Sequence, residues 1–421
     1  MNINKLLSGI SDCVCGKKHT CPIDYVEIGE GALNILPEIC KNYESILLVA
    51  DHNTYKAAGK AAYALLAEKI NKTLILGESG ELLIPDEKAL DTIRSSVSDE
   101  TDLILGVGSG VINDLCKEVS FENNLPYYII ATAPSMDGYA SVGSALILGG
   151  MKITMNARPP KAIIADSEVI RNAPMDMIKA GYGDIIGKFS CLSDWKLAAL
   201  LRNEYFCPEV YTLTLDTANR VRELTNKISE RDGEAISALM EALVAVGIAM
   251  AYVGSSRPAS GCEHHLSHYF EITGILNGED YFAHGIDVGF SAVKCAQIRE
   301  KMLSIAPVKR NFDKEKWISE IKRIYSTSSD GVIALQEQLG WYEEEDSDTV
   351  AAKWNEICEI LKEVPTASEF ISMLSEVGLN YSDFEELYGK KKIDDAILYA
   401  KDLKDRYTIL WLYYTYFREE H

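Results

Sequence analysis

Four of the seven histidines in this 421-residue chain lie within 21 residues of one another, namely His264, His265, His268 and His284. Imidazole is the commonest transition-metal ligand among side chains, and it titrates closest to neutral pH. A histidine cluster in a chain that otherwise has few therefore indicates a metal site or an acid–base site. The alternative is a helix with internally satisfied polar residues, which is disfavoured because chance rarely concentrates a scarce residue type in this way.

A glycine-rich turn, residues 106–110, ends an apolar run and precedes a helix expected to begin at Val111. Backbone amides at a helix N-terminus suit a pyrophosphate when no side chains obstruct them, although such glycines can also be purely steric. Asp51 ends an earlier predicted strand and could bind an adenosine ribose. In the Rossmann fingerprint the acidic residue follows the glycines by about 20 residues. Here it precedes them, which indicates a different dinucleotide-binding arrangement.

Two further polar segments end predicted elements. Residues 131–141 leave a strand at the edge where open α/β sheets bind ligands, and a plain Asx or Ser turn is an equal alternative there. Residues 181–188 are expected to open a helix, with Asp184 near its start. That carboxylate could cap the helix or, with two histidines, complete a metal site.

These candidate residues need elements to position them, and the hydrophobic pattern changes near residue 170. Before it, β-rich runs alternate with helix-patterned segments such as 55–70, which predicts a parallel sheet. After Pro174 the pattern is helical almost to the end. We therefore expect an α/β dinucleotide-binding domain over residues 1–172 and an all-α metal- and substrate-binding domain over 173–421. The predicted strands are 45–51, 73–77, 103–110, 127–135 and 162–165, with a hairpin of 145–148 and 152–155 around Gly149 and Gly150.

Composition restricts the classes of function. The net charge of −21 argues against a nucleic-acid partner, because no basic stripe could release counterions from a phosphate backbone. The N-terminus lacks the apolar core of a signal peptide, and no run reaches the 18 apolar residues of a membrane span. We expect a cytoplasmic protein with no membrane span, forming at least a homodimer.

Ten cysteines in a chain of this length indicate free thiols in a reducing compartment rather than a disulfide framework. Cys13, Cys15, His19 and Cys21 form a tighter group that could bind structural zinc. Their spacing fits no standard zinc finger, which favours unligated surface thiols.

Five segments together resemble one enzyme family. GVGSGVINDL, ATAPSMDGYAS, GYGDIIGKFSCLSDWKLA, SRPASGCEHHLSH and HGIDVG resemble the sn-glycerol-1-phosphate dehydrogenases, in particular their bacterial branch, within the iron-containing alcohol dehydrogenase and dehydroquinate synthase-like superfamily. The resemblance spans roughly residues 25–300 in order. Ser109 departs from the family pattern, because many relatives have glycine there, but serine is small enough to allow phosphate binding. The C-terminal part carries no motif of the family.

The resemblance implies a metal bound by Asp184, His264 and His284, and substrate contacts from Asp137, Asp184 and His268. It also implies most of a cofactor-binding set, to which the glycine turn adds Gly108 and the strand end adds Asp51. The full expected cofactor set is Asp51, Gly108, Gly110, Val111, Ile112, Asn113, Asp114, Thr132, Ala133, Pro134, Ser135 and Ser141.

Helical spacing agrees with these implied roles. His264 and His268 are four positions apart, so on a helix they share one face about 6 Å apart along the axis. A metal on His264 would place its substrate beside His268. His265 is rotated by about 100° and is interpreted as structural.

The activity implied by the resemblance is metal-dependent, NAD(P)H-linked, reversible reduction of dihydroxyacetone phosphate to sn-glycerol 1-phosphate. Zinc or nickel is favoured over iron as the divalent ion. Asp51 favours NAD(H) by repelling a 2′-phosphate, with NADP(H) as the alternative. Lys188 and Arg257 are the candidate cations for the substrate phosphate. The alternatives are a dehydrogenase of an unphosphorylated polyol such as glycerol, a dehydroquinate synthase-like lyase, and a non-catalytic nucleotide-binding protein.

Overall fold

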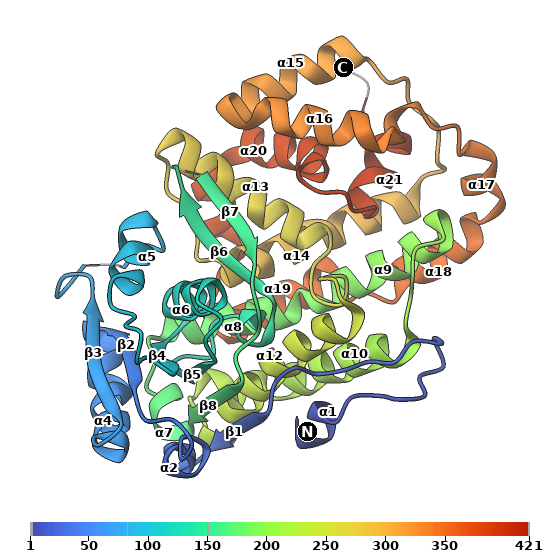
Figure 1. The fold of residues 1–421 in the computed structure, drawn as a ribbon. Helices are drawn as coiled ribbons and strands as arrows, with labels where there is room; N and C mark the ends of the chain where they lie inside the picture. Colours follow the sequence, from blue (N-terminus) through green and yellow to red (C-terminus); the bar gives the residue numbers. More distant parts are fainter. Residues whose placement is uncertain (1–2, 82, 150, 420–421) are drawn as a thin grey trace. The chain divides into compact units, whose positions relative to one another are not determined.

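The computed structural model describes residues 3–81, 83–149 and 151–419 (Figure 1). The chain divides into two compact units. Unit 1 comprises Met1–Ile185 and Glu223–Ser255, and unit 2 comprises Ile186–Arg222 and Ser256–His421. The sequence placed the division at residue 172. The structural division differs because the chain returns to unit 1 after residue 222. There helix α12 (Gly233–Val253) packs against α1 (Ile3–Leu7), β1 (Tyr25–Gly29), α7 (Ser167–Ile170) and η3 (Asp137–Ala140).

A six-stranded parallel sheet forms the centre of unit 1, in the order β1-β8-β5-β4-β2-β3. Every residue of β4, β5 and β8 is buried, as expected for a parallel sheet covered on both faces. This confirms the predicted fold class. The strands are β1 (Tyr25–Gly29), β2 (Ile46–Asp51), β3 (Ile70–Leu76), β4 (Leu103–Gly108), β5 (Tyr127–Ala131) and β8 (Ala162–Asp166).

Two details of the sheet differ from the predicted pattern. β1 was not predicted, and its five residues pair with β8 at one edge of the sheet. β3 begins at Ile70, the residue where the preceding helix was expected to end. The predicted hairpin forms from antiparallel β6 (Gly143–Leu148) and β7 (Met151–Asn156), while Gly150 lies outside the described residues.

Helical segments complete unit 1. They are α1 (Ile3–Leu7), η1 (Ala32–Ile35), α2 (Leu36–Ile39), α3 (His52–Thr54), η2 (Tyr55–Gly59), α4 (Lys60–Leu66), α5 (Glu87–Arg94), α6 (Gly110–Glu122), η3 (Asp137–Ala140), α7 (Ser167–Ile170), α8 (Met175–Ile186, its last residue in unit 2), α11 (Thr225–Ser229) and α12 (Gly233–Val253).

Helix α12 is the most apolar helix of unit 1. It is long and apolar enough to cross a membrane by length and composition, yet 72% of its apolar window is buried inside the fold. Gly247 allows a close approach, because a Cβ there would lie 2.6 Å from the Cβ of Ala140. These features are those of a central core helix.

In the described part of unit 2 all regular elements are helical, which confirms the helical pattern predicted after Pro174. The C-terminal helix is buried almost completely, as core rather than exposed surface. The helices are α9 (Lys188–Arg202), α10 (Pro208–Glu223, its last residue in unit 1), α13 (Cys262–Asn277), α14 (His284–Ser304), α15 (Lys314–Tyr325), η4 (Ser326–Ser328), α16 (Ser329–Leu339), η5 (Trp341–Glu343), α17 (Ser347–Ala352), α18 (Trp354–Lys362), α19 (Ala367–Glu376), α20 (Tyr381–Tyr399), η6 (Ala400–Leu403) and α21 (Ile409–Tyr416).

Candidate active site and metal ligands

Three of the clustered histidines converge within unit 2. His264 and His268 lie on α13, and His284 is the first residue of α14, which packs against α13. The ring centroid of His284 is 5.1 Å from that of His264 and 5.4 Å from that of His268. The centroids of His264 and His268 are 6.0 Å apart, as expected for one face of a helix. The packing of two helices thus creates a three-imidazole cluster.

The first turn of α13 is held in place by α9. Asp194 on α9 accepts a 2.7 Å hydrogen bond from the backbone N–H of Cys262 and a 2.9 Å hydrogen bond from that of Ile409. Gly261 lets the helices approach, because a Cβ there would lie 2.6 Å from the Cα of Cys191. The helix end that carries His264 is therefore rigidly positioned.

Glu263 orients the ring of His264. Its Oε1 lies 2.7 Å from Nδ1 of His264 and accepts a 2.8 Å hydrogen bond from the backbone N–H of Gly261. Burial favours the neutral acid, but the hydrogen bonds that the carboxylate accepts from His264 and from the backbone N–H of Gly261 help to hold the pKa of Glu263 below its ordinary value. An ionised Glu263 only accepts, so Nδ1 carries the proton and Nε2 takes the deprotonated form that binds metals. Sequence reasoning missed this role, although Glu263 directly precedes His264.

His284 and His265 differ in their surroundings. Ser267 on α13 lies 3.4 Å from Nδ1 of His284 and donates to its backbone carbonyl at 3.3 Å. His265 is completely buried, and neither ring nitrogen has a hydrogen-bond partner among the described residues. Burial holds the pKa of His265 well below its ordinary value. This environment agrees with a structural role for His265.

Asp184 and Asp137 meet within unit 1. The buried carboxylate of Asp184 accepts a 3.0 Å hydrogen bond from the backbone N–H of Asp137, the first residue of η3. Asp184 lies in the last turn of α8, so the expectation that it sits near a helix start, as a possible cap, is wrong. Gly181 lies in the same helix and lets it pack closely, because a Cβ there would lie 1.8 Å from the carbonyl oxygen of Pro134. Gly181 thus serves close helix packing rather than a turn.

Asp51, the glycine turn and residues 132–135 follow three adjacent strands, β2, β4 and β5, at their carboxyl ends. In parallel sheets this edge is where ligands bind. Asp51 caps α3, and its Oδ1 accepts hydrogen bonds from Asn53 and Thr54 at 2.7 and 2.8 Å. The sheet thus gathers these predicted cofactor residues on one edge of unit 1.

The glycine turn leads directly into α6. A Cβ at Gly108 would lie 2.6 Å from the Cβ of Ile112, so this position requires glycine. Ser109 precedes the helix and makes no side-chain cap. Its Oγ lies 2.5 Å from Oγ of Ser135 and 3.2 Å from the hydroxyl oxygen of Tyr139. Ser109, where many relatives have glycine, therefore links the glycine turn to residues 132–135 through its hydroxyl group.

Two of the expected cofactor side chains have internal partners. The Nδ2 of Asn113 donates to Asp114 at 3.0 Å, and Asp114 accepts from the backbone N–H of Ala145 at 3.2 Å. Lys117 lies 3.4 Å from Asp114 and donates to the carbonyls of Gly138 and Gly143. Burial raises the pKa of Asp114. These side chains hold η3 and the β6–β7 hairpin against α6.

The remaining expected cofactor positions occupy the start of α6 and the loop after β5. Thr132 donates its backbone N–H to Gly108 at 3.0 Å, and Ala133 accepts from the hydroxyl of Tyr139 at 2.7 Å. Ser141 donates to the carbonyl of Gly138 at 3.0 Å. Gly110, Val111 and Ile112 form the first turn of α6, with their amides at its N-terminus.

The two expected phosphate-binding cations have partners inside unit 2. The Nζ of Lys188 is buried and donates to the carbonyl of Ala259 at 2.9 Å. Arg257 pairs with Glu204 and donates to the carbonyl of Tyr407 at 3.0 Å. Both side chains stabilise the segment that leads into α13.

Known proteins similar to this chain agree with the resemblance. A family model described as iron-containing alcohol dehydrogenase matches residues 27–174. The chain is 38% identical over 289 residues to a glycerol-1-phosphate dehydrogenase (NAD(P)+) from Halalkalibacterium halodurans, covering 67% of this chain and 72% of that protein. A protein of the same name from Bacillus licheniformis is 34% identical over 297 residues, covering 69% and 74% of the two chains.

A solved structure shares the fold. Sulfoacetaldehyde reductase from Bifidobacterium kashiwanohense, in complex with NAD+, matches with a TM-score of 0.63 at 13% identity, covering 94% of this chain and 97% of that chain. At this identity the match shows the fold alone.

Proposed function

This chain belongs to the glycerol-1-phosphate dehydrogenase family, and we propose that it catalyses the NAD(P)H-linked, metal-dependent and reversible reduction of dihydroxyacetone phosphate to sn-glycerol 1-phosphate. The structural observation that carries the proposal is the three-imidazole cluster of His264, His268 and His284. Two of these imidazoles can bind a metal that polarises a carbonyl, and the third lies close enough to contact the substrate.

We propose Asp184, His264 and His284 as the ligands of a divalent ion, zinc or nickel rather than iron. The donor set fits, because one carboxylate and two imidazoles leave coordination positions open for substrate. The Glu263 hydrogen bond at Nδ1 of His264 supports this, since metal-binding histidines commonly donate their other ring N–H to a carboxylate. When bound, the ion supplies Lewis-acid polarisation of the C2 carbonyl.

We propose that NAD(H) binds along the carboxyl edge of the sheet. The amides of the first turn of α6 would hold the pyrophosphate, helped by the positive end of the helix dipole. Asp51 would accept from a ribose hydroxyl through the carboxylate oxygen that the cap leaves available, while its charge repels a 2′-phosphate. This makes NAD(H) the preferred cofactor over NADP(H).

We assign proton delivery to His268 and substrate positioning to Asp137 and Asp184. The imidazole of His268 lies beside both proposed histidine ligands, so its ring can donate a proton to the substrate oxygen as hydride reaches C2. Lys188 and Arg257 are occupied by internal contacts. We therefore propose that they shape the segment that leads into α13 rather than hold the substrate phosphate.

The test is an NADH oxidation assay with protein of known metal content, comparing dihydroxyacetone phosphate, dihydroxyacetone and glyceraldehyde 3-phosphate. We expect a strong preference for dihydroxyacetone phosphate, because binding energy from the non-reacting phosphate positions the carbonyl. Equal turnover of dihydroxyacetone would replace this function by that of an unphosphorylated-polyol dehydrogenase.

We also propose that the enzyme acts in the cytoplasm as a homo-oligomer. None of the ten cysteines, all within the described residues, forms a disulfide bond, which suits a reducing compartment. Light scattering on the purified protein measures the oligomeric state.

A further inference from the structure

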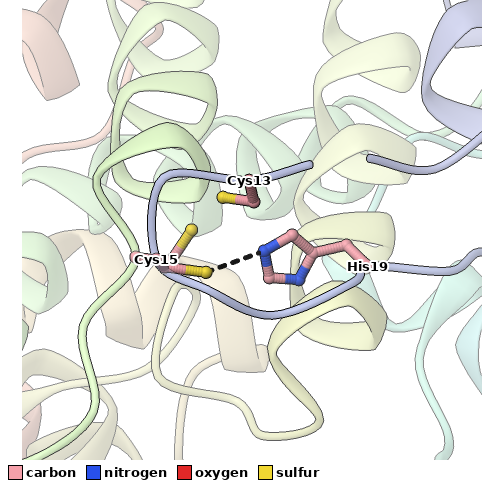
Figure 2. A group of neighbouring side chains, drawn as sticks. Cys13, Cys15 and His19 are labelled. Atoms are coloured by element: carbon pink, nitrogen blue, oxygen red, sulfur yellow. Dashed lines mark hydrogen bonds between the residues drawn. The ribbon is translucent and has the colours of Figure 1, made fainter. Parts of the chain in front are cut away.

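The segment between α1 and β1 brings together three metal-binding side chains outside the site described above. Cys13, Cys15 and His19 each offer one ligand atom, and these atoms lie within 4.8 Å of one another. Figure 2 shows the three side chains converging from a single loop of unit 1. From this geometry we propose that Cys13, Cys15 and His19 form a structural zinc site, which goes beyond the proposed function.

The backbone of this loop is shaped to present the three side chains. Ile10 and His19 exchange two backbone hydrogen bonds of 3.0 and 2.9 Å, which close the loop that contains both cysteines. Gly16, with a φ of 80°, donates its N–H to the carbonyl of Cys13 at 2.9 Å and turns the chain between Cys13 and His19. A positive φ at this turn favours glycine.

The distances suit tetrahedral zinc. Zinc bonds of about 2.3 Å to sulfur and 2.0 Å to nitrogen place neighbouring donors about 3.5 to 3.8 Å apart. The Sγ of Cys15 lies 3.3 Å from Nε2 of His19. Small side-chain adjustments therefore bring the donors into coordination.

His19 is held in the orientation and tautomer that a metal ligand needs. Its Nδ1 lies 2.7 Å from the backbone carbonyl of Tyr252 on α12, and a carbonyl oxygen can only accept. Nδ1 therefore carries the proton, and the deprotonated Nε2 faces Cys15. The ring is 1% exposed and lies 5.6 Å from the ring of Tyr252. Donation of the second ring N–H to a backbone carbonyl is a common feature of zinc-binding histidines.

Charge balance also favours zinc. Binding would release two thiol protons to solvent, and the two thiolates would offset the charge of Zn²⁺ while His19 stays neutral; the fourth position of the tetrahedron is left for a further donor. Neutrality matters because Cys13 and His19 are buried, where an uncompensated charge is costly. Because Cys13 is buried, the prediction that these cysteines are surface thiols is wrong for Cys13. Cys21, which the sequence grouped with these residues, does not belong to this cluster.

The first experiment is a cobalt titration of the full-length reduced protein. Thiolate ligands give a sulfur-to-cobalt charge-transfer band, whereas the proposed catalytic ligands Asp184, His264 and His284 contain no sulfur. After the metal has been removed with a chelator, we expect the band to appear within two equivalents of cobalt, because the proposed catalytic site can take up one of them, and to disappear when zinc is added. If the band did not appear in the reduced wild-type protein, the proposal would be overturned. This result does not depend on whether any variant folds.

The second experiment measures zinc content in matched variants. Cys13→Ser, Cys15→Ser and His19→Gln should each lose one zinc per chain, while the control Cys21→Ser should keep it. In His264→Ala the cobalt–sulfur band should persist, because His264 does not belong to the zinc site. A failure of the catalytic-metal proposal is therefore distinguishable from a failure of the zinc-site proposal. Unchanged zinc content in Cys13→Ser, or a Cys13–Cys15 disulfide found by mass spectrometry in its place, would refute the zinc site.

Discussion

The carboxylate of Glu263 accepts a 2.7 Å hydrogen bond from Nδ1 of its neighbour in sequence, His264. Adjacent residues on a helix point in directions about 100° apart. The side chain of Glu263 must therefore bend back over the first turn of α13, where it also accepts a hydrogen bond from the backbone N–H of Gly261. The pair fixes both the tautomer and the ring direction of a proposed metal ligand.

Glu263→Gln should therefore lower metal affinity by about 10- to 100-fold, the usual effect of removing a carboxylate behind a metal-bound histidine. A competition titration against a chromogenic chelator measures this. The exposed Glu279→Gln in the same unit serves as the control. Equal affinity in the Glu263 variant and the wild type would mean that Glu263 does not orient a ligand.

His268→Ala should retain the metal but lower kcat/KM for dihydroxyacetone phosphate by about 10² to 10⁴-fold, the range for a lost general acid. A loss of only about 1.5 to 3 kcal/mol of transition-state stabilisation, mostly in KM, would indicate a substrate hydrogen bond instead. His264→Ala is the comparison, since it should lose metal and turnover while keeping NADH binding. If His268→Ala also lost the metal, His268 would be a ligand rather than the acid.

Asp51 has two separable roles, the observed helix cap and the proposed ribose contact. Asp51→Asn keeps a good cap but removes the charge, so it should raise the preference for NADPH relative to NADH with little change in stability. Asp51→Ala should in addition cost about 1 kcal/mol of unfolding free energy. Steady-state kinetics with both cofactors and urea unfolding measure the two effects. An unchanged cofactor preference in both variants would place Asp51 away from the ribose.

Arg257→Ala should destabilise the protein by about 1.5 to 3 kcal/mol, because it removes hydrogen bonds to a charged partner, Glu204, and to the carbonyl of Tyr407. The preference for dihydroxyacetone phosphate over dihydroxyacetone should survive in the folded variant. Arg257→Lys is the matched control that keeps the charge. A selective loss of phosphate preference at normal stability would make Arg257 a substrate ligand.

His265 should contribute a pH dependence to stability. Because burial holds its folded pKa well below the ordinary value, only the unfolded chain takes up the proton as pH falls below about 6.5. Folding stability supplied by neutral His265 is thus present above that pH and lost below it, by up to about 1.4 kcal/mol per pH unit.

His265→Leu should remove this slope, measured as the difference in urea unfolding free energy between wild type and variant from pH 7.5 to 5. The same replacement at the partly exposed His52 is the control. A constant difference across this pH range would show that His265 is protonated equally in both states.

The sequence alone predicted features that depend on neighbouring residues. Alternating strand and helix periodicity predicted the parallel sheet, because strands such as β4, β5 and β8 are buried on both faces and read as apolar runs. Helical spacing placed His264 and His268 on one face. These inferences succeeded because side-chain direction within one element follows from its period.

Tertiary structure decided what depends on distant partners. β1 became a strand by pairing with β8, more than 130 residues away. Asp184 lies in the last turn of helix α8, which packs against the carbonyl of Pro134 at Gly181. The tautomer of His19 is fixed by its hydrogen bond to the backbone carbonyl of Tyr252, 233 positions along the chain. No local pattern encodes these contacts, because they arise only when folding brings separate elements together and buried polar groups must find hydrogen-bond partners there.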